Sequence, residues 1–146
     1  MASNFPNAID AFATNRSDAT PMATTHASDH NNENDAINKI EAFLIPALNT
    51  QTASYTLVLG DTSKVVEMNV AAANNLTVPP NSSVAYPVGA MLEICQMGAG
   101  QTTLVPGTGV TLRSPGGKLK LVGQYSSAGL RKRATDEWVV AGELAT

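Results

Sequence analysis

Turn signals interrupt the chain so often after Ala53 that no long helix is expected there. Short runs of aliphatic and β-branched residues alternate with glycine, proline, asparagine and aspartate. Glycine and proline supply the backbone angles of tight turns, whereas β-branched residues favour extended strands. Short strands with turns at this frequency predict an all-β sandwich, roll or barrel over residues 51–146.

Several of these turns have recognisable signatures. Gly60-Asp61 separates two short strands that are expected within residues 54–69. Ser114-Pro115-Gly116-Gly117 has proline and glycine where a type II turn requires them, which predicts a hairpin over residues 109–125. Between these regions we expect a strand, a Pro79-Pro80-Asn81 turn and a second, longer strand.

Residues 96–110 spell QMGAGQTTLVPGTGV, a glycine-rich run that invites comparison with phosphate-binding loops. Such loops need a lysine or a helix N-terminus beside the glycines to supply positive charge. Here Thr103 stands where the dinucleotide fingerprint requires its third glycine, no lysine follows, and the next residues favour a strand. We therefore expect turns at Gly98 to Gly100 and at Gly107 to Gly109, and no cofactor.

The composition predicts a thin core. Only 14% of the residues are charged and 5% are aromatic, and the net charge is -3. A chain that must build its core from few large side chains often completes it by forming oligomers. The sequence has no dense basic patch of the kind that binds a nucleic-acid backbone, and no apolar window long enough for a membrane span, so neither partner is expected.

Residues 25–50 contain the clearest helical pattern. His26, His30 and Glu33 continue in one heptad register into three apolar residues, Ile37, Ile40 and Leu44. Isoleucine at both core positions of a coiled coil favours three or more strands, so the pattern predicts a short trimeric seam. A single amphipathic helix packed on its own domain fits the same residues and remains an alternative. Pro46 is expected to end the helix.

The first 24 residues form a third region. Phe5, Ile9 and Phe12 are spaced by four and then three residues, which would place them on one face of a short helix. A lone helix of this length is not stable in water. The segment is therefore either disordered or an arm that docks its two phenylalanines on another surface.

No catalytic or metal-binding constellation is evident. His26 and His30 have the spacing of a metal pair on a helix, but structural sites normally have four ligands, so we expect no metal. The β region lacks histidine, the commonest general base, and its acidic residues are scattered. We therefore expect the protein not to be an enzyme.

Some polar residues of the β region have more ordinary interpretations. Asp61 and Asp136 fall at expected turns and should be exposed. Arg131-Lys132-Arg133 is expected to form a solvated or interchain ion-paired edge. Cys95, the single cysteine, is expected to be a small buried residue and not a nucleophile.

Trp138, the single tryptophan, lies in the last expected strand, residues 136–144. Alternation places it on one face of that strand together with Val140. It is expected in the core or at a subunit contact, and we assign it to the trimer interface. A carbohydrate-stacking platform is the alternative role for Trp138, and it is shared by Tyr125.

The β region resembles a domain found at the C-terminus of tailed-bacteriophage virion proteins, including head fibres, decoration proteins and tail-fibre components. The resemblance lies in an ordered series of motifs over about two-thirds of the chain. These are Val-Glu-Met-Asn, Pro-Val-Gly before a long strand, the turn QMGAGQ, Gly-Val-Thr-Leu and a closing Trp-Val-x-x-Gly. The segment HASDHNNENDAINKIE is similar to the short helix that precedes such domains.

The resemblance implies a homotrimer displayed on a virus particle. The expected architecture is mainly β: an extended capsid-attachment arm over residues 1–24, a short coiled-coil helix and linker over 25–50, and a compact antiparallel sandwich or barrel-like knob over 51–146. The expected partners are the chain itself and the major capsid protein, which Phe5, Ile9 and Phe12 would contact.

The expected location rests on the resemblance together with the length of the segment that precedes the β region. The protein would be made in the host cytoplasm, since its first residues lack the pattern of a signal peptide, and would sit on the outer surface of the virion head. Only a short helix precedes the β region, which favours the head over the tail. A tail-fibre or baseplate tip that binds a host-surface glycan is the alternative.

Overall fold

The computed structural model describes residues 33–40 and 45–146. The chain divides into two compact units, Met1–Ile45 and Pro46–Thr146, and each is considered by itself. Residues 33–40 are helical, as the heptad pattern predicts. The predictions for the arm residues Phe5, Ile9 and Phe12, for the two histidines and for Leu44 lie outside the described residues.

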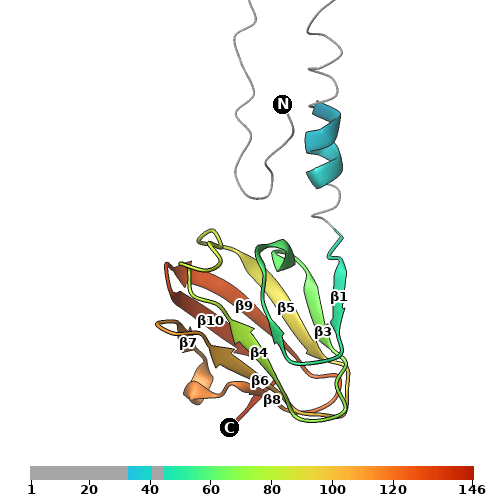
Figure 1. Ribbon diagram of the computed structural model, residues 1–146, viewed down its shortest axis with the longest axis vertical. Coiled ribbons are helices and arrows are strands. Elements are labelled where there is room, and N and C mark those ends of the chain that lie inside the picture. Colours follow the sequence, from blue (N-terminus) through green and yellow to red (C-terminus); the bar gives the residue numbers. More distant parts are fainter. Residues whose placement is uncertain (1–32, 41–44) are drawn as a thin grey trace, which may run out of the picture. The chain divides into compact units, whose positions relative to one another are not determined.

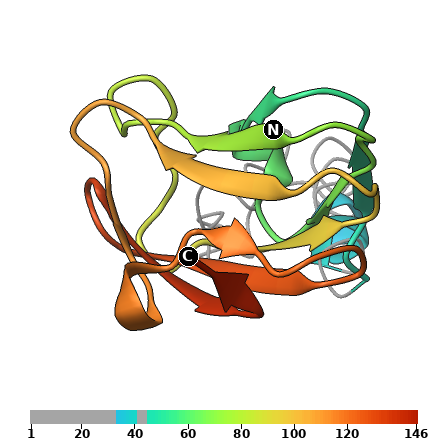
Figure 2. The same ribbon diagram turned by 90° about the horizontal axis from the view of Figure 1, so that it is seen from below.

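The second unit is a two-layered β domain, so the prediction of a mainly β fold is confirmed. Figures 1 and 2 show two sheets that face each other across the core, without closing into a barrel. The first sheet has the strand order β1-β3-β5-β9-β10-β7 and the second has the order β11-β8-β6-β4-β2. The strands are β1 (Leu48–Gln51), β2 (Tyr55–Thr56), β3 (Val65–Met68), β4 (Asn74–Val78), β5 (Met91–Gln96), β6 (Thr102–Pro106), β7 (Thr111–Arg113), β8 (Lys120–Leu121), β9 (Ser127–Ala134), β10 (Glu137–Gly142) and β11 (Leu144–Ala145).

The first part of the domain is wound as a flattened coil, in which each turn contains one strand of each sheet. Strands β1 to β8 alternate between the two sheets, so β1, β3 and β5 become parallel neighbours in one sheet, and β2, β4 and β6 in the other. Antiparallel pairing is confined to β5 with β9, β9 with β10, β6 with β8 and β8 with β11. The expectation of an antiparallel domain is therefore wrong, and both sheets are mixed.

The hairpin predicted over residues 109–125 does not form, although its turn does. Gly116 has a φ of 67° and Gly117 donates its N–H to the Ser114 carbonyl at 3.1 Å, as a turn requires. The strands on its two sides nevertheless belong to different sheets. The same holds for β2 and β3, which flank the short 3₁₀ turn η1 (Leu59–Asp61). Each turn sends the chain across the core instead of back along its own sheet.

Asp61 explains how the first of these crossings is fixed. Its side chain is 1% exposed, which corrects the expectation of a surface turn residue. The carboxylate accepts hydrogen bonds from Asn49 Nδ2 at 2.7 Å, the Val58 N–H at 2.8 Å and the Tyr55 hydroxyl at 3.2 Å. A buried carboxylate needs such donors, so the turn is held against β1 and β2.

The glycine-rich segment forms turns, as predicted, and the reason is close backbone contact. Gly98 and Gly100 donate their N–H groups at 2.9 Å to the carbonyls of Met68 and Val70, in the preceding turn of the coil. A Cβ on Gly98 would collide with the backbone of Val70, and one on Gly100 with the backbone of Ala72. Glycine is the residue that permits such an approach.

Polar side chains fill the interior beside these stacked turns. Gln96, Thr102 and Asn74 are each at most 5% exposed. The Thr102 hydroxyl donates to Asn74 Oδ1 at 2.9 Å, and the Thr102 N–H donates to Gln96 Oε1 at 3.1 Å. The amides of Asn74 and Gln96 donate in turn to the carbonyls of Gly100 and Gly98 at 3.3 Å. These bonds satisfy backbone groups that the bend would otherwise bury unpaired.

The alternation of the strands places the apolar core between the sheets. In β5 and β9 every second residue is buried, including Leu92, Ile94, Ala128 and Leu130. The remaining core side chains include Leu57, Val66, Met68, Leu76, Val78, Tyr86, Leu104, Leu121, Trp138 and Val140. The opposite faces of the strands are left for solvent or for partners.

Substitution of Gly100 by alanine tests the stacked turns. Because the added methyl group overlaps the Ala72 backbone, we expect Gly100→Ala to lower the free energy of unfolding by about 1–3 kcal/mol, the usual cost of overpacking. Gly60→Ala is the matched control, since nothing lies within 4 Å of its Cβ position, and its effect should stay within about 0.5 kcal/mol. Urea denaturation measures both. Equal stability of the two variants would contradict this account.

Candidate interaction surfaces

The helix of residues 33–40 presents two large apolar side chains to its surroundings. Ile37 is 52% exposed and Ile40 is 48% exposed. They are three residues apart and therefore share one face of the helix. An isoleucine pair left this open would gain from burial against another surface, which agrees with the predicted apolar seam.

Trp138 lies inside the β domain and not on a surface. Its side chain is 1% exposed and packs edge-on against Tyr86, with ring centroids 5.2 Å apart and an interplanar angle of 84°. The expectation that it lies in the core is confirmed, whereas its assignment to the trimer interface and the alternative role as a carbohydrate-stacking platform are wrong. Both need an indole that another molecule can reach, whereas the core of its own domain already covers this one.

Lys132 is buried beside the same ring, which corrects the expectation for the basic triplet. It is 2% exposed, and its ammonium lies 6.0 Å from the centre of the Trp138 ring system. The ammonium donates to Asn81 Oδ1 and, at 2.7 Å, to the Tyr86 carbonyl. Burial lowers the pKa of Lys132, against the opposing effect of Asp136. The side chain therefore anchors the long segment between β4 and β5.

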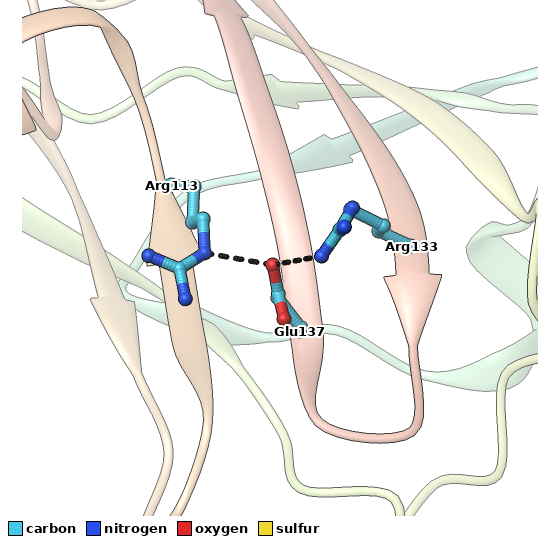
Figure 3. A network of polar contacts seen from close by, with 3 residues as sticks. All are labelled: Arg113, Arg133 and Glu137. Atoms are coloured by element: carbon cyan, nitrogen blue, oxygen red, sulfur yellow. Dashed lines mark hydrogen bonds and ion pairs between the residues drawn. The ribbon is translucent and has the colours of Figure 1, made fainter.

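The flanking arginine, Arg133, is exposed and belongs to an ion-pair cluster at the edge of the first sheet (Figure 3). Arg113 Nε and a terminal nitrogen of Arg133 each lie 2.7 Å from the same oxygen of Glu137. These hydrogen bonds, led by that from Arg113, hold the pKa of Glu137 below its ordinary value. The cluster joins β7, β9 and β10. One carboxylate between two guanidinium groups leaves excess positive charge there.

Cys95 lies on the outward side of β5 and is partly exposed, so the expectation of a buried cysteine is wrong. Alternation does place it with Met91 and Glu93, as expected, but that side faces away from the core. Desolvation raises the pKa of the thiol, and the negative charges of Glu93, Glu67 and Glu143 raise it further. A thiol held protonated in this way is a poor nucleophile.

The outward-facing charged side chains of the first sheet define a charge-divided surface, which we call the outer face of the first sheet. Glu67 on β3 and Glu93 on β5 lie on one side of it, and Arg131 on β9 and Arg113 on β7 lie on the other. The strand register places Met91, which is 60% exposed, directly opposite Arg131. A face that is acidic on one side and basic on the other is complementary to a second copy of itself.

The charge-divided face could not be read from the sequence. Strand β9 was not among the expected strands, and the run Arg131-Lys132-Arg133 was interpreted as a solvated or interchain ion-paired edge. A signal was present, however. From Ala128 to Lys132 every second residue points into the core, so the intervening arginines must point outward.

Tyr125 is the other exposed aromatic residue that the sequence singled out. It is 69% exposed and has a φ of 69°, in the left-handed region that few residues other than glycine adopt. It lies in an open depression that also includes Val122, Gln124 and Glu143. Of the two stacking residues considered, only Tyr125 is accessible to a ligand.

Among the residues that the structure describes, no group of three or more histidine, cysteine, aspartate or glutamate side chains is placed to hold a metal ion. Within the same part of the chain, no helix is both long and apolar enough to cross a membrane. No protein-family model matches the sequence, and no curated protein matches it either.

The buried Tyr86 makes the stability of the β domain sensitive to high pH. Its hydroxyl donates to the Val58 carbonyl, and burial, followed by the charge of Asp61, raises its pKa well above the ordinary value of 10.0. The folded state keeps this proton where the unfolded chain releases it, so stability is complete below about pH 10 and falls above it. The lowered pKa of Lys132 acts in the opposite sense, but its effect is complete by about pH 10.4.

We expect Tyr86→Phe to make this alkaline loss shallower by up to about 1.4 kcal/mol per pH unit, the contribution of one proton. Urea denaturation of both proteins at several pH values between about 10 and 11.5 measures the two slopes. The variant should be less stable than the wild type at neutral pH, because it lacks the hydrogen bond to Val58. Identical slopes would show that Tyr86 does not control the alkaline transition.

Proposed function

We propose that the chain is a bacteriophage structural protein, a capsid decoration or head-fibre protein that attaches as a homotrimer to the outer surface of the virion head. The observation that supports this most is the pair of half-exposed isoleucines, Ile37 and Ile40, on the helix ahead of a self-contained β domain. This isoleucine pair could be buried between the helices of neighbouring chains. The series of motifs that resembles tailed-bacteriophage virion proteins supports the assignment to a phage.

In this proposal the helix brings three chains together. Ile37 and Ile40 continue one heptad register with Leu44, and isoleucine at both core positions favours three-stranded packing. Burial of an isoleucine contributes about 1.5–3 kcal/mol, so even a short seam gains appreciably from three chains. The seam alone is too short to hold a trimer strongly, and a contact between β domains would add to it.

The charge-divided outer face supplies a candidate for that second contact. In a closed ring of three copies the acidic side of one face, with Glu67 and Glu93, would meet the basic side of the next, with Arg131 and Arg113. Such a head-to-tail arrangement is heterologous and closes when the rotation between copies is a third of a turn. Complementary charges of this kind mainly fix orientation and partner choice.

The N-terminal segment would attach the trimer to the major capsid protein. Phe5, Ile9 and Phe12 supply three apolar side chains for a docking face, and each trimer would present three copies of them. Linking three weak contacts raises the overall affinity without any new contact, provided that all three can bind at once. A threefold arrangement of sites on the capsid surface would satisfy that condition.

The trimer is tested by replacing both exposed isoleucines. Light scattering on the wild type should give a mass of about three times 15.2 kDa. We expect Ile37→Asn combined with Ile40→Asn to shift the protein toward the monomer, because the seam loses two apolar side chains per chain. Asn38→Ala is the matched control: it lies on the same helix, outside the register, and should remain trimeric. A monomeric wild type, or a double variant that stays trimeric, would contradict the helical seam.

The role of the arm is tested by deleting residues 1–24. We expect the shortened protein to remain trimeric and to lose co-sedimentation with purified capsids, since the apolar docking residues are gone. The full chain, mixed with the same capsids, is the control and should sediment with them. Undiminished sedimentation of the shortened protein would remove the arm from the attachment mechanism.

A second candidate function is a tail-fibre or baseplate tip that binds host-surface carbohydrate. The observation in its favour is Tyr125, an aromatic ring left open to solvent in a depression with polar neighbours. The two functions differ in what the shortened protein should do. A host-binding tip would still bind cells without residues 1–24, whereas a head decoration protein would not bind capsids.

A further inference from the structure

The depression around Tyr125 lies at a defined end of the β domain. Strands β1, β3 and β5 are parallel, so all three finish at the same end, which is opposite to the end where the chain enters at Pro46. The Tyr125 N–H donates at 2.7 Å to the carbonyl of Gln96, the last residue of β5. Tyr125 therefore lies at the end of the β domain that is opposite to Pro46.

The depression is shallow and combines apolar with polar groups. It is open to solvent and has a volume of about 540 Å³. Val122, 61% exposed, and Tyr125 supply apolar surface, while Gln124 and Glu143 supply polar groups beside it. Binding sites for small molecules typically combine apolar walls with a few placed polar groups.

The backbone holds Tyr125 in an unfavourable conformation. At a φ of 69° its Cβ crowds its own backbone, a conformation that is normally left to glycine, asparagine or aspartate. The loop is fixed on both sides. Gln124 Nε2 donates to the Met97 carbonyl at 2.9 Å, and the Gly123 N–H donates to the Ser126 hydroxyl at 3.1 Å. Strain of this kind persists only where the surroundings impose it, and it is concentrated at functional sites.

We propose that this depression is a subsite for a neutral sugar ring, with Tyr125 as the stacking group. The flat apolar face of a pyranose matches an exposed phenol ring, and its hydroxyl groups can donate to the Glu143 carboxylate, which offers several acceptor positions. Glu143 uses one oxygen to accept a 3.3 Å bond from the Ser127 N–H, which holds it at the rim.

The charge around the depression selects against acidic sugars. Glu143 is the charged side chain among the residues that line the depression, and its charge is negative. An anionic sugar would be repelled there. The biological role of this subsite rests on the second candidate function. Sugar binding itself requires neither a capsid nor the N-terminal arm.

Saturation-transfer NMR on the full chain tests the subsite with four neutral probes, the methyl glycosides of glucose, galactose, mannose and N-acetylglucosamine, and one anionic probe, N-acetylneuraminic acid. We expect transfer from the protein to at least one neutral probe and a weaker response from the anionic sugar. Absence of transfer to all four neutral probes would overturn the proposal. A stronger response from the anionic sugar would overturn it as well.

Two substitutions of Tyr125 distinguish the contribution of its aromatic ring from an effect on the conformation of the loop. Tyr125→Phe keeps the aromatic face and should retain transfer. Tyr125→Asn removes the ring but tolerates the left-handed conformation, so the loop should keep its fold while binding weakens by about tenfold. Unchanged binding by Tyr125→Asn would contradict the assignment.

A measurement on the wild type removes any dependence on how the asparagine variant folds. Tyr125→Phe identifies the Tyr125 ring signals in a spectrum of the tyrosine-labelled protein. Titration with the best neutral probe should shift those signals, while the signals of the buried Tyr86 stay in place. Unshifted Tyr125 signals would overturn the proposal. Because this experiment needs no capsid, its failure is distinguishable from failure of the attachment model.

Discussion

Backbone contact between successive turns of the coil is the constraint on which the rest of the β domain depends. Gly98 and Gly100 let one turn lie directly on the backbone of the turn before it, at Val70 and Ala72. This contact fixes the parallel register of the strands that precede and follow the turns. It also bounds the interior space that the Thr102 side chain fills. The Tyr125 loop lies beside these turns, since its N–H donates to the carbonyl of Gln96.

The local part of this fold could be predicted from the sequence, and the pairing of the strands could not. Glycine and proline mark turns through their own backbone preferences, so the turns at Gly98 to Gly100 and around Gly116 were predicted correctly. Which strand pairs with which depends on contacts between distant residues. A turn signal such as Gly60-Asp61 looks the same whether the chain returns along its own sheet or crosses to the other one.

For the surfaces, too, only the features that neighbouring residues in the sequence determine could be predicted. The heptad spacing predicted that Ile37 and Ile40 share a helix face, and both are half exposed there. Alternation alone cannot tell the inner face of a strand from the outer one, which is why Cys95 was expected to be buried and why Trp138 was assigned to a subunit interface as well as to the core. The left-handed backbone at Tyr125 has no sequence signal at all, because tyrosine is not a typical turn residue.

We propose that a trimer of this protein decorates the head of a virion, with the β domain exposed. Electron microscopy of the virions that carry it, with an antibody fragment against the β domain, tests this most directly. The account predicts label over the outer surface of the head, centred on positions of threefold local symmetry. Label confined to the tail or its tip would contradict it, and so would the absence of label from the outer surface of the head.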